Sequence, residues 1–283
     1  MINAKTLFYH YPLGINLRNY LIKRANSPAA LRLADDKIAF KKLLRQNGLK
    51  TANSFYEMNS HYDLCAVKSF PDEFVIKPNR GLGGNGIILI KRRGDDFINP
   101  SEKIYTDKEL RQHVKRIMDG EYSGQMEQDA CLIEERIYCS NKLRFKEALG
   151  LPDIRVFCFN NLPVLAMIRY PTAASAGRAN LTAGALGLAL DLESGAITRV
   201  SSKKTKRNYS LAEIGVPENF RLPAWSEIKA MAKKTAELSG LKIAGVDIVL
   251  DAADQPLVLE INGRPGLEIQ NINGRSLLES MAD

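Results

Sequence analysis

Hydrophobic positions along the chain recur mainly at strand spacing, in short runs that come in pairs. The runs "EFVIKP" and "IILI", "DIRVFCF" and "LPVLAMIRY", and "AGVDIVL" and "PLVLEIN" each predict two strands joined by a loop or turn. A further pair, in "GALGLALDLESGAITRV", turns at "ESG". The regular alternation of strands and helices that builds a doubly wound parallel sheet is missing. The pattern therefore predicts an α+β fold that is rich in hairpins.

Helical spacing is confined to a few segments. In "PAWSEIKAMAKKTAELSGLK", apolar residues recur at helical spacing and Gly240 closes the run, which predicts the clearest helix. "LADDKIAFKKLLRQNGLKT" predicts another helix, capped by Asp35 or Asp36 and ended by Gly48. We also expect helices near residues 16–25 and 107–118, and a strand over "ACLIEERI" (130–137).

The composition is that of an ordinary globular protein. The 283 residues are 45% hydrophobic and 25% charged, and no apolar run approaches the roughly 20 residues of a membrane-spanning helix. The N-terminal segment lacks the compact apolar core and the cleavage site of a signal peptide. We therefore expect no membrane span and a cytoplasmic location.

Cysteines and histidines form no catalytic or metal-binding pattern. Cys65, Cys131, Cys139 and Cys158 make no C-x-x-C pair, and each lies in or near an apolar stretch, so we expect buried structural thiols. The three histidines are scattered, without the spacing of a zinc site or of a Ser-His-Asp triad.

The net charge of +8 is dispersed except for one cluster, "SSKKTKRN" (201–208). This cluster is either a solvated loop or a docking patch for an acidic partner or a phosphate. Motifs that read nucleic-acid bases are absent, so we expect no specific nucleic-acid partner.

The segment "FVIKPNRGLGGNGIILI" places Lys77 before a glycine-rich loop. Gly81, Gly83 and Gly86 fit G-x-G-x-x-G, but a dinucleotide site needs a helix after the loop, and "IILI" predicts a strand. A P-loop and the kinase H-R-D and D-F-G motifs are absent. A flexible hairpin without a ligand is one alternative. In the other, Lys77 points at nucleotide phosphates while the glycines, Gly84 included, let backbone N–H groups approach the oxygens.

Such a phosphate site needs magnesium ligands, and the C-terminal hairpin offers three. Glu260 and Asn262 share a face because they are two positions apart on one strand. Folding the hairpin symmetrically about its turn places Asp247 opposite Glu260. Burying unpartnered acids among apolar neighbours is costly, and two carboxylates with an amide suit Mg²⁺. The alternative is an ordinary exposed sheet face.

Four segments in order resemble the ATP-grasp superfamily: "DDKIAFKKLLRQNGL", "FVIKPNRGLGGNGI", "LIEERI" with "DIR", and "GVDIVL" with "LEINGRPGLE". "GRANLTAGA" resembles the family's R-x-N-L segment, and "PDIRVF" and "INGRPGLEIQ" are most similar to the subgroup related to α-L-glutamate ligases, also called sugar-transfer-associated ATP-grasp. The resemblance covers about Asp35 to Leu278. It implies two α+β lobes that sandwich ATP, divided into a lead-in (1–50), a small lobe (51–135) and a large lobe (136–283).

The resemblance also implies roles for individual residues. Lys77, Arg178 and Asn180 would be catalytic, with the last two facing the transferring phosphate. Asp247, Glu260 and Asn262 would bind two Mg²⁺ ions, with Mn²⁺ as an alternative. ATP would contact Lys37, Lys77, Gly81, Gly83, Gly84, the adenine-reading strand Glu134, Glu135, Arg136 and Ile137, and Asp153 at the ribose. We expect Arg155 and Arg264 either to contact a substrate carboxylate or phosphate, or to form salt bridges.

Three departures from the family pattern bear on the substrate. From the short segment before Lys37 we expect a truncated N-terminal lead-in, where full ligases of this class carry an α/β domain that helps bind substrate. The segment "YCSNKLRFKEALGLP" (138–152) is a basic insertion that forms either a substrate wall or a plain loop. "TAGA" after "RANL" and "NGRPG" differ from the common versions near the reacting centre.

The leading interpretation is ATP-dependent ligation of a carboxylate to an amine through an acyl phosphate, as in glutamate ligases. The carboxylate would come from a small molecule, a peptide or a protein tail. The alternatives are an ATP-grasp phosphotransferase and a non-catalytic nucleotide-binding partner in polysaccharide or peptide assembly. An intact set of magnesium ligands argues against the non-catalytic alternative.

Overall fold

A computed structural model of the chain describes residues 11–81, 83–123, 127–146 and 149–282. Leu82 of the glycine-rich loop and residues 147–148 of the basic insertion lie outside them. The described residues divide into two compact units. Unit 1 comprises the described residues up to Ala34, Leu43–Lys50 and Tyr138 onwards, and unit 2 comprises Asp35–Lys42 and Thr51–Ile137. The division expected from the resemblance, at residues 50 and 135, stays a prediction.

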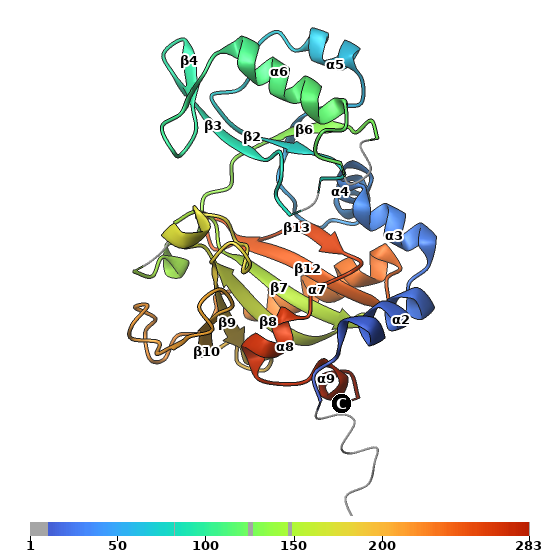
Figure 1. Cartoon of the computed structure of the whole chain (residues 1–283), viewed down its shortest axis with the longest axis vertical. Coiled ribbons are helices and arrows are strands. Elements are labelled where there is room, and N and C mark those ends of the chain that lie inside the picture. The colour runs from blue at the N-terminus through green and yellow to red at the C-terminus, as the bar shows by residue number, and fades with distance from the viewer. Residues whose placement is uncertain (1–10, 82, 124–126, 147–148, 283) are drawn as a thin grey trace, which may run out of the picture. The chain divides into compact units, whose positions relative to one another are not determined.

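Unit 2 is built on an antiparallel sheet whose described strands number six, in the order β1-β6-β2-β3-β4-β5 (Figure 1). Helices α5 and α6 pack on one face. Their core includes alternate residues of β2, such as Phe74 and Ile76, as strand geometry requires. The elements are α4 (Lys37–Gln46, shared with unit 1), β1 (Ser54–Met58), α5 (His61–Ala66), β2 (Glu73–Pro78), β3 (Ile88–Arg93), β4 (Asp96–Ile98), β5 (Ile104–Tyr105), α6 (Asp107–Met118) and β6 (Cys131–Glu134).

Unit 1 is built on a sheet whose described strands number seven, in the order β11-β10-β9-β8-β7-β12-β13. Helix α7 packs on one face and helices α8 and α9 on the other (Figure 1). The elements are α2 (Ile15–Ala25), α3 (Pro28–Asp35, whose last residue belongs to unit 2), η1 (Asn141–Leu143), β7 (Asp153–Phe159), β8 (Leu162–Tyr170), η2 (Ala173–Ser175), β9 (Leu186–Leu190), β10 (Ile197–Ser202), β11 (Asn208–Tyr209), α7 (Trp225–Ser239), β12 (Ile243–Leu250), β13 (Pro256–Asn262), α8 (Glu268–Asn273) and α9 (Leu277–Ala282).

The hairpin-rich α+β fold confirms the prediction from the hydrophobic pattern, and strand β2 has the expected bounds. Two expectations are wrong. The strand expected over residues 130–137 ends at Glu134, because Glu135 turns to Asn53: its N–H donates to the Asn53 carbonyl at 2.9 Å, and its carboxylate accepts from the Asn53 N–H at 2.8 Å. All four cysteines are free thiols, but Cys65, on the short helix α5, is exposed while the other three are buried.

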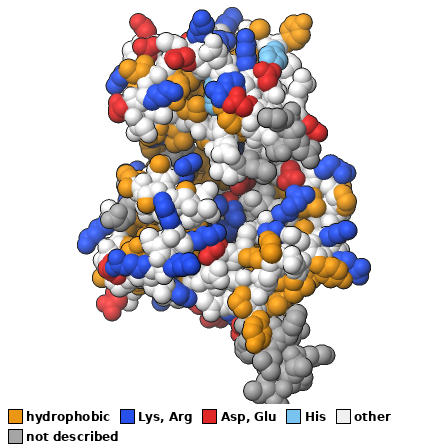
Figure 2. Space-filling model, viewed as in Figure 1, with side chains coloured by type: hydrophobic (Ala, Val, Ile, Leu, Met, Phe, Trp, Pro, Cys, Tyr) orange, Lys and Arg blue, Asp and Glu red, His pale blue; other side chains and the backbone are white. Residues whose placement is uncertain are grey.

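Charged side chains are mixed over the visible surface. On the face in Figure 2, lysines and arginines lie among acidic and apolar groups. Within the basic segment 201–208, residues 203–207 form the exposed turn between β10 and β11, where Lys203 lies 3.3 Å from Glu268 and Arg207 forms an ion pair with Glu213. None of the described helices combines the length and the apolar character needed to cross a membrane.

Part of the basic insertion 138–152 packs onto the rest of unit 1, around Phe145. The ring of Phe145 stacks on Tyr170 with centroids 5.5 Å apart and meets Phe220 edge-on at 5.2 Å. The Tyr170 hydroxyl accepts from the Phe145 N–H at 2.8 Å, and the Lys146 N–H donates to the Ile214 carbonyl at 3.2 Å. The part around Phe145 therefore belongs to the packed structure of unit 1.

Candidate active site

The glycine-rich loop joins β2 to β3 in unit 2 and is sterically crowded at both ends. A Cβ on Gly81 would lie 2.2 Å from the ring of Pro78, so no larger residue fits there. At Gly86 the backbone has a φ of +77° and a Cβ would meet the Tyr122 ring at 2.7 Å. Gly83 and Gly84, between them, are exposed. The loop therefore presents an uncovered backbone between two packed ends.

Helix α4 holds the first end of this loop. The Lys37 ammonium donates to the carbonyl oxygens of Asn79 at 3.0 Å and of Gly81 at 3.2 Å. In return, Asn79 accepts from the Ile38 N–H at 2.9 Å and donates to the Asp36 carboxylate at 3.1 Å. Asp36 also caps the helix by accepting from the Ala39 N–H at 2.9 Å, as one of the two predicted capping residues. Lys37, a predicted phosphate ligand, thus contacts the loop predicted to cover the phosphates.

Helix α6 holds the second end. The ring of His113 is buried beside Tyr122, and its Nε2 lies 2.9 Å from the carbonyl oxygen of Gly86. Because a carbonyl only accepts, this contact needs a proton on Nε2. Burial lowers the pKa of His113, while the bond to Gly86 opposes that effect. Neutral His113 can therefore anchor the loop.

Lys77 belongs to a buried charged cluster on the other face of the unit 2 sheet. Lys77 alternates with the core residue Ile76, and Glu134 alternates with the core residue Ile133. Lys77 and Lys41, from α4, form ion pairs with the two different carboxylate oxygens of Glu134. The side chains of Lys41 and Glu134 are each 3% exposed, and that of Lys77 is 11% exposed. Burial alone would raise the pKa of Glu134, but Lys77 and Lys41 together hold it below its usual value.

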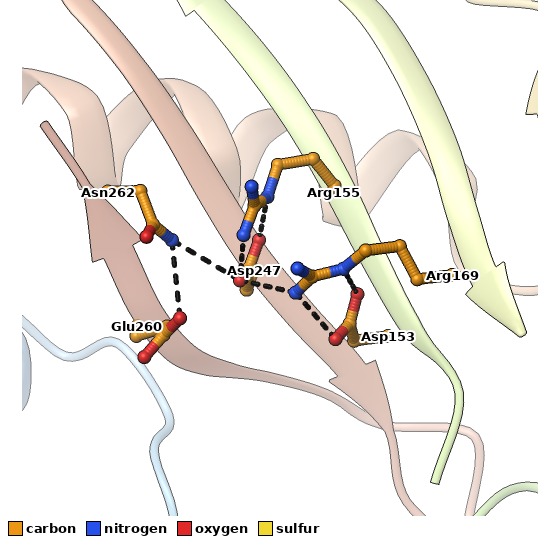
Figure 3. Close-up of polar contacts among 6 residues, drawn as sticks. All are labelled: Asp153, Arg155, Arg169, Asp247, Glu260 and Asn262. Carbon is orange, nitrogen blue, oxygen red and sulfur yellow. Dashed lines mark hydrogen bonds and ion pairs between the residues drawn. The ribbon is translucent and has the colours of Figure 1, made fainter. Parts of the chain in front are cut away.

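A second charged cluster lies on the unit 1 sheet (Figure 3). Across the strand pairs, Asp153 stands opposite Arg169, Arg155 opposite Asp247, and Asp247 opposite Glu260. The last pairing confirms the register predicted from the hairpin turn. Because side chains alternate along strands, these residues share one face of the sheet.

Bidentate ion pairs connect the members of this second cluster. Arg155 binds both carboxylate oxygens of Asp247, with its Nη2 2.5 Å from Oδ2. Arg169 binds both oxygens of Asp153 at 2.6 Å, and its Nη2 also donates to Asp247 at 2.6 Å. Burial raises the pKa of Asp153, with Arg169 opposing and Asp247 adding to the shift. Burial would raise that of Asp247 too, but Arg155 and Arg169 lower it below its usual value.

Glu260 and Asn262 border this cluster on β13 and are both half-buried. The Asn262 amide donates to Glu260 and to Asp247, each at 3.3 Å, so the three predicted magnesium ligands lie together (Figure 3). Within the described chain, no cluster of three or more His, Cys, Asp or Glu is arranged to hold a metal. Two carboxylates and an amide nevertheless have the oxygen chemistry that Mg²⁺ prefers. Glu260 fits this use as it stands, whereas Asp247 would have to exchange an arginine contact, and Asn262, whose amide nitrogen faces the two carboxylates, would have to turn its oxygen toward the ion.

Arg178 and Asn180 lie in the loop between β8 and β9. The Asn180 Oδ1 accepts from the N–H groups of Thr182 at 2.9 Å and Ala183 at 3.2 Å, so this oxygen shapes the loop and leaves the amide nitrogen for a ligand. Arg178 is exposed, and its Nε donates to the Ser175 carbonyl at 3.4 Å. Both positions are compatible with the roles implied by the resemblance, which stay predictions.

The remaining predicted residues are Glu135, Arg136 and Ile137 in unit 2 and Arg264 in unit 1. Glu135 binds Asn53, and Arg136 and Ile137 follow the end of β6, half-buried. Arg264 is exposed just after β13, next to Pro265, whose carbonyl accepts from Arg18 at 3.2 Å.

The chain matches the family described as sugar-transfer associated ATP-grasp over residues 16–283. It belongs to this ATP-grasp family. It is 25% identical to a protein named "Probable alpha-L-glutamate ligase" from Shewanella halifaxensis (strain HAW-EB4), over 100% of this chain and 48% of the relative. It is 26% identical, with the same coverage, to a protein of that name from Shewanella pealeana (strain ATCC 700345 / ANG-SQ1). The chain thus spans about half the length of the curated relatives it matches.

A solved structure supports the fold of this ATP-grasp protein. The L-amino acid ligase from Bacillus licheniformis aligns with a TM-score of 0.52 at 14% identity, covering 89% of this chain and 47% of that one. Family membership and this likeness together confirm the resemblance and the fold class predicted from the motifs.

Two members of the clusters in this ATP-grasp protein were not predicted. Symmetric folding about the "NNLP" turn places Tyr170, not Arg169, opposite Asp153, and the observed pairing depends on a register shift between Phe157 and Cys158, so the count used for the C-terminal hairpin would have missed Arg169. Lys41 follows Lys37 by one helical turn, but its partner Glu134 is 93 residues away, and no local pattern indicates that contact.

Proposed function

We propose that the chain is an ATP- and Mg²⁺-dependent ligase that joins a carboxylate to an amine. The observation that carries this proposal is the Asp247, Glu260 and Asn262 set, held on one sheet face of an ATP-grasp protein. The two relatives named as probable α-L-glutamate ligases make glutamate the first substrate to test. A cytoplasmic location, where ATP is available, is part of the proposal.

Glu260 and Asn262 would hold the magnesium ion, with Asp247 as third ligand. Mg²⁺ would neutralise charge on the ATP phosphates, as it does in other phosphoryl transfers. In unit 2, Lys77, Lys37 and the exposed backbone around Gly84 would bind phosphate oxygens, because ammonium and N–H groups are the donors that phosphates accept from.

The reaction would proceed in two displacements on the substrates. A carboxylate oxygen attacks the γ-phosphorus of ATP and ADP leaves, which gives an acyl phosphate. The amine nitrogen then attacks the acyl carbon, phosphate leaves and the nitrogen loses a proton. Arg178 would face the transferring phosphate and balance its charge. Neither displacement needs a covalent bond to the protein, so a nucleophilic triad is not required.

Product analysis tests this proposal. The purified protein would be incubated with ATP, Mg²⁺, glutamate, and in turn amino acids, amino sugars and peptides as second substrate. ADP together with a new amide, identified by mass spectrometry, supports ligation. A phosphorylated product without an amide would indicate a phosphotransferase instead, and bound ATP without turnover would indicate a non-catalytic nucleotide-binding protein.

A pair of variants tests the magnesium ligands. Glu260→Gln keeps the shape of the side chain and removes its charge, so we expect ADP formation to fall by about a hundredfold or more, the scale of losing one charge-stabilising group. Glu218→Gln, at an exposed position in the same unit, should leave activity unchanged. Equal activity in the two variants would refute the metal assignment.

A further inference from the structure

Asn26, between α2 and α3, has no part in the proposed reaction, yet it is buried and its side chain makes four hydrogen bonds to the main chain. Its Oδ1 accepts from the N–H groups of Lys242 at 2.8 Å and Ile243 at 3.0 Å. Its Nδ2 donates to the carbonyl oxygens of Ile243 at 2.8 Å and Gly263 at 3.1 Å. The amide thus uses both of its N–H groups and both lone pairs of its oxygen.

These bonds lie at the open end of the hairpin that carries the proposed magnesium ligands. The last residue pair between β12 and β13 is Gly245 opposite Asn262. Beyond that pair, Asn26 connects Ile243, the first residue of β12, to Gly263, which directly follows β13. In the described unit 1 sheet, β13 is an edge strand that pairs with β12, and the ends of such strands are held by few hydrogen bonds. Asn26 therefore supplies bonds that a further residue pair would have made.

A second side chain from the same region also holds Gly263. A Cβ on Gly263 would lie 2.6 Å from Cδ2 of Leu31, so the side chain of Leu31, on α3, occupies the space beside this glycine. Asn26 itself is fixed, because its N–H donates to the Ile22 carbonyl at 2.8 Å at the end of α2. The main chain directly after Asn262 is therefore held from both α3 and the end of α2.

This support matters because a metal ligand has to be placed accurately. Mg²⁺ accepts little deviation from octahedral geometry, and ligand groups have to be held within about 0.5 Å. The amide nitrogen of Asn262 faces Asp247 and Glu260, so its oxygen has to turn toward the ion. That turn places the oxygen reproducibly only when the main chain of Asn262 stays fixed.

We propose that Asn26 is a positioning residue for the magnesium site: together with Leu31, it fixes the main chain at the open end of the β12–β13 hairpin, so that Asn262 can present its amide oxygen to the ion. This inference rests on the proposed function, in which Asn262 binds Mg²⁺. Asn26 acts through the main chain and contacts neither the ion nor ATP. A purely structural asparagine would instead lower the stability of unit 1 and leave the affinity for the ion unchanged.

Binding of Mn²⁺, a paramagnetic ion that shares the oxygen preference of Mg²⁺, tests this role without turnover. Electron paramagnetic resonance of Mn²⁺ with protein and ADP distinguishes the protein-bound ion from the ion in solution. We expect Asn26→Ala to raise the Kd of Mn²⁺ by about tenfold or more, the scale of losing a group that supports a metal ligand. Asn273→Ala is the matched control, because the Asn273 amide also donates to two carbonyls, those of Ala166 at 3.1 Å and Ile269 at 2.9 Å, away from this hairpin. It should bind Mn²⁺ as the unaltered protein does.

Amide hydrogen exchange separates a local loss of position from a general loss of stability. In Asn26→Ala, we expect faster exchange at residues 261–263, at the open end, and little change at residues 257 and 258, near the turn. Equally faster exchange at both ends of β13 would overturn the inference. If Asn26→Ala does not fold, Leu31→Ala takes its place and should raise the Kd of Mn²⁺ by about threefold, less than the loss of a hydrogen-bonding partner. A Kd in Leu31→Ala equal to that of the unaltered protein would then overturn the inference.

Metal binding and product formation distinguish this inference from the proposed function. If the unaltered protein binds Mn²⁺ and Asn26→Ala binds it as tightly as Asn273→Ala does, the inference is wrong and the proposed function stands. If Mn²⁺ binding depends on Asn26 but no amide product forms, the proposed function is wrong and the inference holds for the metal site. If the unaltered protein binds no Mn²⁺, both are wrong.

Discussion

The two buried charged clusters have opposite compositions. In unit 2, Lys41 and Lys77 share one carboxylate, Glu134. In unit 1, two guanidinium groups, Arg155 and Arg169, face three carboxylates once Glu260 is counted with Asp153 and Asp247. Among these residues, lysines outnumber carboxylates in the first cluster, and carboxylates outnumber arginines in the second.

This difference indicates what each cluster is suited to bind. A buried site with an excess of positive charge favours an anion, and one with an excess of negative charge and spare oxygen donors favours a cation. A phosphate and Mg²⁺ are the two components of an ATP complex. In unit 1 the half-buried Glu260 is proposed to contact Mg²⁺. In unit 2 Lys77, the least buried of the three charged residues, is proposed to contact the phosphate.

The largest effect on stability should come from removing the carboxylate that both lysines of unit 2 share. Glu134→Gln breaks the ion pairs of Glu134 with Lys41 and Lys77 in a buried place, and breaking a buried ion pair from one side costs about 3–5 kcal/mol. Hydrogen exchange of the β2 and β6 amides would measure this loss within unit 2. Glu127→Gln, exposed in the same unit, serves as the control. A loss below about 1 kcal/mol would contradict a cluster that depends on Glu134.

A somewhat smaller effect should come from Arg169→Met in the negative cluster. Asp247 keeps Arg155, but the buried Asp153 loses its bidentate partner, and we expect a loss of about 3 kcal/mol at alkaline pH, where Asp153 is charged. The exposed Arg199→Met on β10 should change stability by no more than about 0.5 kcal/mol.

The pH dependence of that loss sharpens the comparison. Burial already raises the pKa of Asp153 in the folded protein, and removing Arg169 would raise it further. A carboxyl whose folded pKa lies above its unfolded value favours the fold at low pH and opposes it as pH rises. The folded pKa of Asp153 is about 7 with Arg169 present, so the deficit of Arg169→Met should shrink as pH falls from alkaline values toward about 7 and level off below it. Urea titrations across this range would measure it, and a deficit that is constant with pH would contradict an unpaired Asp153.

How much of these clusters the sequence could predict depends on the distance between partners. Within one hairpin, the position of the turn determines which residues pair across the two strands. Asp247 could therefore be placed opposite Glu260 from the sequence alone. Arg155 and Asp247 are 92 residues apart on neighbouring strands, and their pairing depends on how separate hairpins assemble. The ion pairs that complete both clusters are thus products of tertiary structure.

The ends of helices and the exposure of cysteines show the same contrast between local features, which the sequence predicts, and tertiary ones, which it does not. Gly48 and Gly240 adopt the positive φ expected of helix-ending glycines, because this requirement is local. Exposure of Cys65 was not predicted, because it depends on which side of the six-residue helix α5 faces the sheet. That Asp247, Glu260 and Asn262 lie together could be predicted, and a salt bridge of Arg155 was one of two expected outcomes, but its partner Asp247 and the contact of Arg169 with Asp247 could not be predicted.

The smallest predicted effect concerns His113, the neutral group that holds the second end of the glycine-rich loop. Burial lowers the pKa of His113 below its ordinary value of 6.5, so the folded protein binds this proton less readily than the unfolded chain does. The stabilisation from His113 is present above pH 6.5 and is lost as pH falls through the lowered pKa. Removing the ring nitrogen that bonds to Gly86 should cost about 1 kcal/mol at alkaline pH.

His113→Leu should therefore be less stable than the unaltered protein at alkaline pH, with a deficit that narrows in acid. Hydrogen exchange of amides flanking the loop, measured at several pH values, would detect this change. His61→Leu, which alters a histidine at the surface that is 52% exposed, provides the matched control. The stability deficits of His113→Leu and Arg169→Met should both narrow as pH falls, but for different reasons. In Arg169→Met, the buried carboxyl of Asp153 in unit 1 gains a proton. In the unaltered protein, acid protonates the buried imidazole of His113 in unit 2 and removes its stabilising effect. A His113→Leu deficit that widened in acid would mean that the folded protein favours the charged ring, which would contradict a neutral anchor for Gly86.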